Sequence, residues 1–199
     1  MRMRGTFVVL EGIDGSGKST LALALAERLG DAEVTSEPTR GPIGAALRSG
    51  GFGDLPPAAE ALLFAADRAL HTEEISRLLG ERRWVICDRY FASTVAYQSA
   101  AMGGDSVGWL IEIQRNSVMD PDMTILLDVD PRISMPRVEG RGEARSRFEE
   151  PGYLCEVRRQ YLSLAERYGY RVIDASKSKE EVLEEALAAF GEKGLYAPE

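Results

Sequence analysis

A glycine-rich segment near the start of the chain has the residue types and spacing of a phosphate-binding loop. Residues 12–19 read G-I-D-G-S-G-K-S and fit G-x-x-x-x-G-K-[ST] at every fixed position. The glycines let successive backbone N–H groups point inward around phosphate oxygens. Lys18 can reach the β- and γ-phosphates, and the Ser19 hydroxyl can bind Mg²⁺. The residues predicted to bind a nucleoside triphosphate are Gly12, Ile13, Asp14, Gly15, Ser16, Gly17, Lys18, Ser19 and Thr20.

Three more charged residues follow predicted strands. Asp88 and Arg89 come after the apolar run 84–87, and Arg40 lies in a proline-rich loop after residues 32–36. In a parallel sheet such loops lie at the carboxyl edge, where ligands bind. Asp88 suits a magnesium ligand, with a structural salt bridge to a lysine as the alternative. Arg89 would point into the same cleft, whereas Arg40 is either a phosphate contact or a solvated arginine.

Residues 137–150 form an arginine-rich segment with few apolar side chains. Its arginines are interspersed with glycine and glutamate: Arg137, Arg141, Arg145 and Arg147. This composition predicts a mobile cationic lid whose arginines could stabilise a transferring phosphoryl group. The alternative is an ordinary solvated charged loop.

Two sets of side chains have the helical spacing needed to read a base. Phe64 and Arg68 are four residues apart, and Thr94, Tyr97 and Gln98 follow i, i+3, i+4 spacing. Phe64 and Arg68 could stack on a base and bond its edge, but spacing alone favours a core-edge phenylalanine beside a surface arginine. The only histidine, His71, has no partner in sequence and is interpreted as a surface residue.

Strand-like and helix-like segments alternate along the whole chain. Strands are predicted at 6–10, 32–36, 84–87, 123–127 and 170–173, with helices between them. This order predicts an α/β/α sandwich with a five-stranded parallel sheet, as one domain over residues 1–199.

Bulk composition narrows the class of protein. The chain has 199 residues, 44% hydrophobic content and a net charge of −8, which argues against a general nucleic-acid surface. No apolar run approaches 18 residues, so we expect no membrane span and a cytoplasmic location. Cys87 and Cys155 lack metal spacing and are interpreted as buried, reduced thiols.

Switches and motors fit the remaining sequence poorly. The guanine motif N-K-x-D is absent, and the D-x-x-G at residues 105–108 lies between two predicted helices. A motor ATPase strand would usually end in D-E, whereas here it ends in Asp88-Arg89. An arginine-lined second site and an arginine-rich lid favour phosphoryl transfer to a small phosphorylated acceptor.

These motifs together resemble the thymidylate kinase family, whose members phosphorylate dTMP with ATP. The resemblance rests on E-G-x-D-G-x-G-K-S-T at 11–20, Glu37-Pro38, L-F-A-A-D-R at 63–68, D-R-Y-x-x-S-T-x-A-Y-Q at 88–98, P-D-x-T-x-L-L-D at 121–128 and R-F-E at 147–149. It spans nearly the whole domain and implies a homodimer and Mg²⁺. Another nucleoside monophosphate or deoxynucleoside kinase, and a non-enzymatic nucleotide-binding module, stay open as alternatives.

The resemblance also implies a role for each matching residue. Phe64 would stack on thymine, Arg68 would bond its O4, and Thr94 and Gln98 would contact the base. Tyr97 would crowd the sugar 2′ position, and Asp14 would contact the 3′-hydroxyl or the metal site. Arg89 would hold the dTMP phosphate. The predicted dTMP-binding residues are Asp14, Glu37, Arg40, Phe64, Arg68, Arg89, Thr94, Tyr97 and Gln98.

The catalytic arginine of this family lies either in the phosphate-binding loop or in the lid. The variable loop positions hold no arginine here, so the lid would supply it. The predicted catalytic residues are Lys18, Arg89, Arg141, Arg145 and Arg147. The chain departs from the family at Ser36, where an arginine is frequent, and at Thr39-Arg40-Gly41, where many members have Gly-Gly-Thr. Arg40 could therefore take over a phosphate contact.

Overall fold

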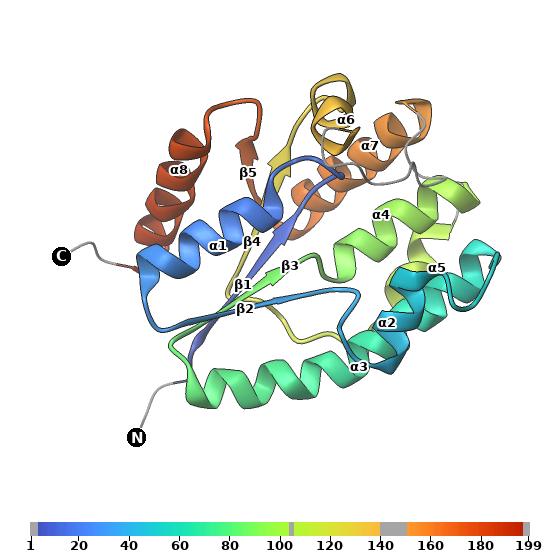
Figure 1. Ribbon diagram of the computed structural model, residues 1–199, viewed down its shortest axis with the longest axis horizontal. Coiled ribbons are helices and arrows are strands. Elements are labelled where there is room, and N and C mark those ends of the chain that lie inside the picture. Colours follow the sequence, from blue (N-terminus) through green and yellow to red (C-terminus); the bar gives the residue numbers. More distant parts are fainter. Residues whose placement is uncertain (1–3, 104–105, 140–150, 197–199) are drawn as a thin grey trace.

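The computed structural model describes residues 4–103, 106–139 and 151–196 (Figure 1). The five strands are β1 (Thr6–Glu11), β2 (Ala32–Ser36), β3 (Trp84–Asp88), β4 (Met123–Asp128) and β5 (Arg171–Asp174). The helices are α1 (Lys18–Leu29), α2 (Pro42–Ser49), α3 (Pro57–Glu81), α4 (Phe91–Met102), α5 (Val107–Glu112), α6 (Pro131–Glu139), α7 (Pro151–Tyr168) and α8 (Lys179–Glu192). The predicted strand–helix alternation is confirmed, with boundaries shifted by one or two residues.

The five strands form one parallel sheet in the order β2-β3-β1-β4-β5. Val8 at the centre of β1 pairs with Ile86 of β3 on one side and Met123 of β4 on the other. Because all strands run the same way, the loops that follow β1, β2 and β3 meet at one edge. The predicted functional loops lie at that edge.

Helices cover both faces of the sheet (Figure 1). The side chains of β1 alternate between two cores, as the pleat requires. Val8 and Leu10 pack in the cluster that includes Leu25 of α1, whereas Phe7 and Val9 pack with residues of α3. Burial on both faces explains why β1 is apolar throughout its middle.

Two expectations about residues outside the predicted site are wrong. His71 is not a surface histidine: it is 1% exposed within α3, where its Nδ1 lies 2.9 Å from Glu37 Oε1 and its Nε2 lies 2.7 Å from Thr35 Oγ1. Cys155 is an exposed thiol, and only Cys87 is buried. Both errors have one cause, since local spacing does not show which helix face the sheet covers. None of the helices in the described ranges is long and apolar enough to span a bilayer.

Candidate functional site

The carboxyl edge of the sheet brings the three predicted loops into contact. The backbone N–H of Arg89, after β3, donates to Leu10 O of β1 at 2.9 Å. The N–H of Glu37, after β2, donates to Asp88 O at 3.1 Å. Extensions of the sheet hydrogen bonding thus hold the loops together just beyond the strands.

The phosphate-binding loop has the conformation that its glycines allow. Gly12 has φ 146°, and a Cβ there would lie 2.6 Å from Leu127 O, so only glycine fits. Gly17 has φ 97° and leads into the N-terminus of α1. The Nζ of Lys18 lies 2.9 Å from Ile13 O and 3.4 Å from Ser16 Oγ, folded over the loop. The loop and Lys18 together form a positively polarised cradle for phosphate.

The charge of Lys18 gives a pH-dependent prediction. Burial, with repulsion from Arg89, lowers the pKa of Lys18 to about 8, although nearby carboxylates oppose the shift. The unliganded protein therefore loses this charge above about pH 8, and if it turns over ATP, kcat/KM for ATP should fall there about tenfold for each pH unit. The kcat should change less, because a bound triphosphate stabilises the ammonium. A flat kcat/KM profile from pH 7 to 9.5, at saturating acceptor, would contradict this.

Ser19 and Asp88 lie together beside the loop. The Ser19 hydroxyl donates to Asp88 Oδ2 at 2.5 Å, while Asp88 Oδ1 is buried and has no hydrogen-bond partner among the described residues. The described salt bridges do not include Asp88 either, so the alternative of a structural lysine pair has no support in this part of the chain. One hydroxyl and one under-bonded carboxylate fit Mg²⁺, which uses few protein ligands beside substrate phosphates.

Arg89 is held in an uncommon backbone conformation at the centre of the site. It is the one non-glycine residue in the described ranges with positive φ, 71°, which costs about 1–3 kcal/mol in general. Its Nη2 lies 2.6 Å from Asp14 Oδ1, and Tyr97 Oη donates to Asp14 Oδ2 at 2.7 Å. Burial would raise the pKa of Asp14, but Arg89 and Lys18 overcome it and hold that pKa well below its usual range. The strained turn therefore places a charged guanidinium next to the phosphate-binding loop.

One cavity of about 160 Å³ collects all the predicted dTMP-binding residues except Arg40. Asp14 and Arg89 line its end near the phosphate-binding loop, while Phe64, Thr94 and Gln98 come from α3 and α4. The Oε1 of Gln98 is buried without a hydrogen-bond partner in the described structure, and its Nε2 donates to Glu60 Oε2 at 3.1 Å. An acceptor is therefore presented at the base end of the cavity.

Arg68 is a buried residue, contrary to the surface interpretation. It is 1% exposed, and its Nε and Nη2 lie 2.8 and 2.5 Å from Glu37 Oε2. Its Nη2 also donates to Thr94 Oγ1 at 3.0 Å, and its Nη1 donates to the Gln114 side chain. Gln114 and the Glu37–His71 contact fix this guanidinium, and sequence reasoning missed both. Gln114 lies 46 residues from Arg68, so no local spacing could reveal it.

Arg40 lies apart from that cavity. It is exposed and lines a separate hollow of about 630 Å³ that also contains Ser19 and Asp88. Its predicted phosphate contact is therefore nearer the magnesium ligands than the base. The contact with dTMP stays a prediction: Arg40→Ala should raise KM for dTMP about threefold or more, and KM for ATP less, by loss of one charged contact. An unchanged KM for dTMP in steady-state assays would rule it out.

Comparisons with known proteins agree with this geometry. The family model described as thymidylate kinase matches residues 10–186. The chain belongs to the thymidylate kinase family. A probable thymidylate kinase of Pyrobaculum aerophilum is 43% identical over 88% of this chain and 91% of its own length. The thymidylate kinase of Alkalilimnicola ehrlichii is 38% identical over 94% of both chains. The fold matches the structure of thymidylate kinase from Candida albicans with a TM-score of 0.79, at 23% identity over 96% of this chain and 93% of that one.

A third cavity in this member of the thymidylate kinase family was not foreseen from the sequence. It measures about 350 Å³ and lies on the outer side of the phosphate-binding loop, against Gly15, Thr20 and residues 177–179. Arg137, at the end of α6, borders it and donates to Ala175 O at 3.0 Å. The other predicted lid residues, Arg141, Arg145 and Arg147, lie outside the described residues.

Proposed function

We propose that this chain is a dTMP kinase that transfers the γ-phosphoryl group of ATP to dTMP, giving dTDP and ADP. The observation that carries the proposal is the pairing of Gln98 and Arg68 in one cavity that ends at Arg89. Thymine offers a donor at N3 and an acceptor at O4. The N3–H donor of thymine matches the unpartnered acceptor Gln98 Oε1, and its O4 acceptor matches the donors of the Arg68 guanidinium. Cytosine has the reverse pattern, with an acceptor at N3 and a donor at its 4-amino group.

The acceptor phosphate would then lie between Arg89 and the phosphate-binding loop. A phosphate oxygen of dTMP is already anionic, so in-line attack on the γ-phosphorus needs no general base. Lys18, Arg89 and an arginine among Arg141, Arg145 and Arg147 would stabilise the charge on the transferring group. Mg²⁺ held by Ser19 and Asp88 would neutralise triphosphate charge when bound. Positioning and electrostatics therefore supply the catalysis.

The remaining family expectations belong to the same proposal. The chain acts as a single domain over residues 1–199, with the arginine-rich lid at about 137–150. It works in the cytoplasm as a homodimer, with ATP and dTMP as its partners and no nucleic acid. The described part of the chain supports the single domain, because one sheet contains every described strand.

The test is ADP release from ATP–Mg²⁺ with a panel of acceptors: dTMP, dUMP, dCMP, dAMP, dGMP, UMP and thymidine. We expect kcat/KM for dTMP to exceed that for dCMP at least about 10³-fold, because a reversed hydrogen-bond pattern leaves buried groups unpaired. The kcat/KM for dUMP should lie within about 200-fold of that for dTMP, because dUMP lacks only the methyl group of thymine. A higher kcat/KM for any other acceptor would retain the fold but overturn the base assignment.

A further inference from the structure

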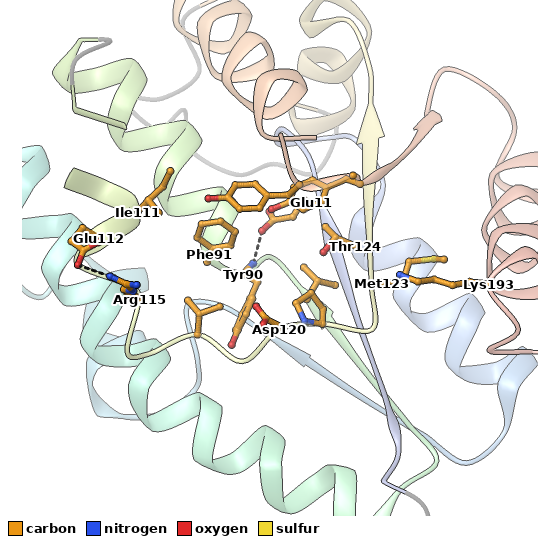
Figure 2. Close-up of a pocket in the computed structure, with 16 residues that line it drawn as sticks. Glu11, Tyr90, Phe91, Ile111, Glu112, Arg115, Asp120, Met123, Thr124 and Lys193 are labelled. Atoms are coloured by element: carbon orange, nitrogen blue, oxygen red, sulfur yellow. Dashed lines mark hydrogen bonds and ion pairs between the residues drawn. The ribbon is translucent and has the colours of Figure 1, made fainter. Parts of the chain in front are cut away.

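Glu11 lies directly behind Arg89, and neither the family motif nor the proposed mechanism gives it a task. It is the last residue of β1 and is fully buried. Figure 2 shows its side chain beside Tyr90 and Phe91, where it lines a cavity of about 780 Å³ that is separate from the dTMP cavity. Burial of a carboxylate requires several hydrogen-bond donors, and Glu11 has four.

One carboxylate oxygen fixes the chain just after Arg89. Glu11 Oε1 accepts from the backbone N–H groups of Tyr90, at 2.9 Å, and Ser93, at 3.2 Å (Figure 2 marks the first bond). These groups belong to the start of α4, where no side chain of the N-cap residue satisfies them. Glu11 therefore holds the turn in which Arg89 has its positive φ of 71°.

The other oxygen sets the direction of two hydroxyl groups. Ser93 Oγ donates to Glu11 Oε2 at 2.5 Å, and Tyr161 Oη lies 3.3 Å from the same oxygen. Both hydroxyls also face Arg89 Nη1, at 3.2 Å for Ser93 and 3.3 Å for Tyr161. Because an ionised carboxylate only accepts, the hydroxyl protons point to Glu11 or to each other, and the oxygen lone pairs point to Arg89.

The hydrogen-bond geometry around Glu11 is that of an ionised carboxylate, because every neighbouring group can donate to it. Burial outweighs the lowering by Ser93, Arg89 and the two backbone N–H groups, so the pKa of Glu11 is raised above its ordinary value. Four donors converge on the two oxygens, and the Arg89 guanidinium lies just beyond them.

We propose that Glu11 is a positioning residue for phosphate recognition: it orients Ser93 and Tyr161 as acceptors for Arg89 Nη1, so that the guanidinium is fixed for the dTMP phosphate. This inference rests on the proposed function, in which Arg89 holds that phosphate. Gly12 O accepts from the same Nη1 at 3.2 Å, and Asp14 Oδ1 lies 2.6 Å from Nη2. Acceptors on both nitrogens thus define the plane of the guanidinium.

The variant Glu11→Gln separates this role from simple packing. Its amide oxygen must take the Oε1 position, because two backbone N–H groups need an acceptor there. Its NH₂ group then faces Ser93 and Tyr161 as a donor, which reverses the hydroxyl directions without changing the shape. We expect KM for dTMP to rise about tenfold, as for the loss of one or two hydrogen bonds to a charged group. KM for ATP and the melting temperature should stay near the wild-type values.

Glu112→Gln is the matched control, since Glu112 lines the same 780 Å³ cavity but is exposed and pairs only with Arg115 among the described salt bridges. It should leave all kinetic constants unchanged. A KM for dTMP within twofold of wild type in Glu11→Gln overturns the inference, and so does an equal rise in both KM values.

Ser93→Ala tests the same inference if Glu11→Gln does not fold. It removes one acceptor of Arg89 and should raise KM for dTMP about threefold, with KM for ATP unchanged; no rise overturns the inference. Arg89→Ala separates the two claims. If it leaves dTMP binding intact, the proposed phosphate contact fails. If Arg89→Ala abolishes dTMP binding but neither Glu11→Gln nor Ser93→Ala weakens dTMP binding, the phosphate contact stands and only the role of Glu11 fails.

Discussion

Arg89→Ala is expected to lower kcat/KM for dTMP about 10³-fold, equivalent to about 4 kcal/mol of transition-state stabilisation. The guanidinium lies at the junction of the dTMP cavity and the phosphate-binding loop, where it would contact the acceptor phosphate throughout the transfer. Its removal also leaves the Asp14 carboxylate without the cation 2.6 Å away. Initial-rate kinetics with each substrate varied in turn would measure the effect.

The control for Arg89 is Arg89→Lys, which keeps a charge but cannot make the paired contacts of a guanidinium. We expect kcat/KM for dTMP in Arg89→Lys to be about tenfold higher than in Arg89→Ala, and so still well below the wild-type value. KM for ATP should stay within about fivefold of wild type in both variants, because Arg89 contacts the phosphate-binding loop at Gly12 O and Asp14 Oδ1, and not at the loop N–H groups that would hold the triphosphate. A larger rise in KM for ATP than for dTMP would show that Arg89 serves the donor instead.

Arg68→Ala is expected to destabilise the fold by about 3–5 kcal/mol, because it leaves a buried carboxylate without its cation. The Arg68 and Glu37 side chains are 1% and 4% exposed, and they pair at 2.5 Å. For a chain of this size the melting temperature should fall by about 10 °C in thermal unfolding. Discrimination between dTMP and dCMP should fall as well, since Arg68 is the proposed donor to O4.

A double variant distinguishes the ion pair from packing in this cluster. Arg68→Met with Glu37→Gln removes both charges and keeps similar volumes, so it should be more stable than Arg68→Ala alone by about 2 kcal/mol or more. Discrimination against dCMP should stay low in the double variant, because it still lacks the guanidinium. Equal stability of the single and double variants would mean that the buried charge is not the source of the loss.

The fold followed from the sequence because local signals and topology agreed. The apolar run of β1 and the glycine pattern after it determine a strand, a turn and a helix. Once the strands are parallel, residues that follow β1 and β3 must share an edge, which explains why Asp14 and Arg89 could be expected to lie close together.

The partners of these residues could not be predicted in the same way. The burial of Arg68 depends on Gln114, and the direction of Arg89 depends on Tyr161, 72 residues further along the chain. Such contacts arise from helix packing against the sheet and leave no periodic signal in the sequence. Arg40 shows the same limit, because its loop lies at the predicted edge while its side chain borders another hollow.

The most direct test of the account is to follow the reaction of ATP–Mg²⁺ with dTMP by ³¹P nuclear magnetic resonance. The account predicts that dTDP and ADP form in equal amounts, while little inorganic phosphate appears and thymidine in place of dTMP gives no nucleotide product. Release of inorganic phosphate without dTDP would contradict it, because the site would then direct water, and not the acceptor phosphate, to the γ-phosphorus.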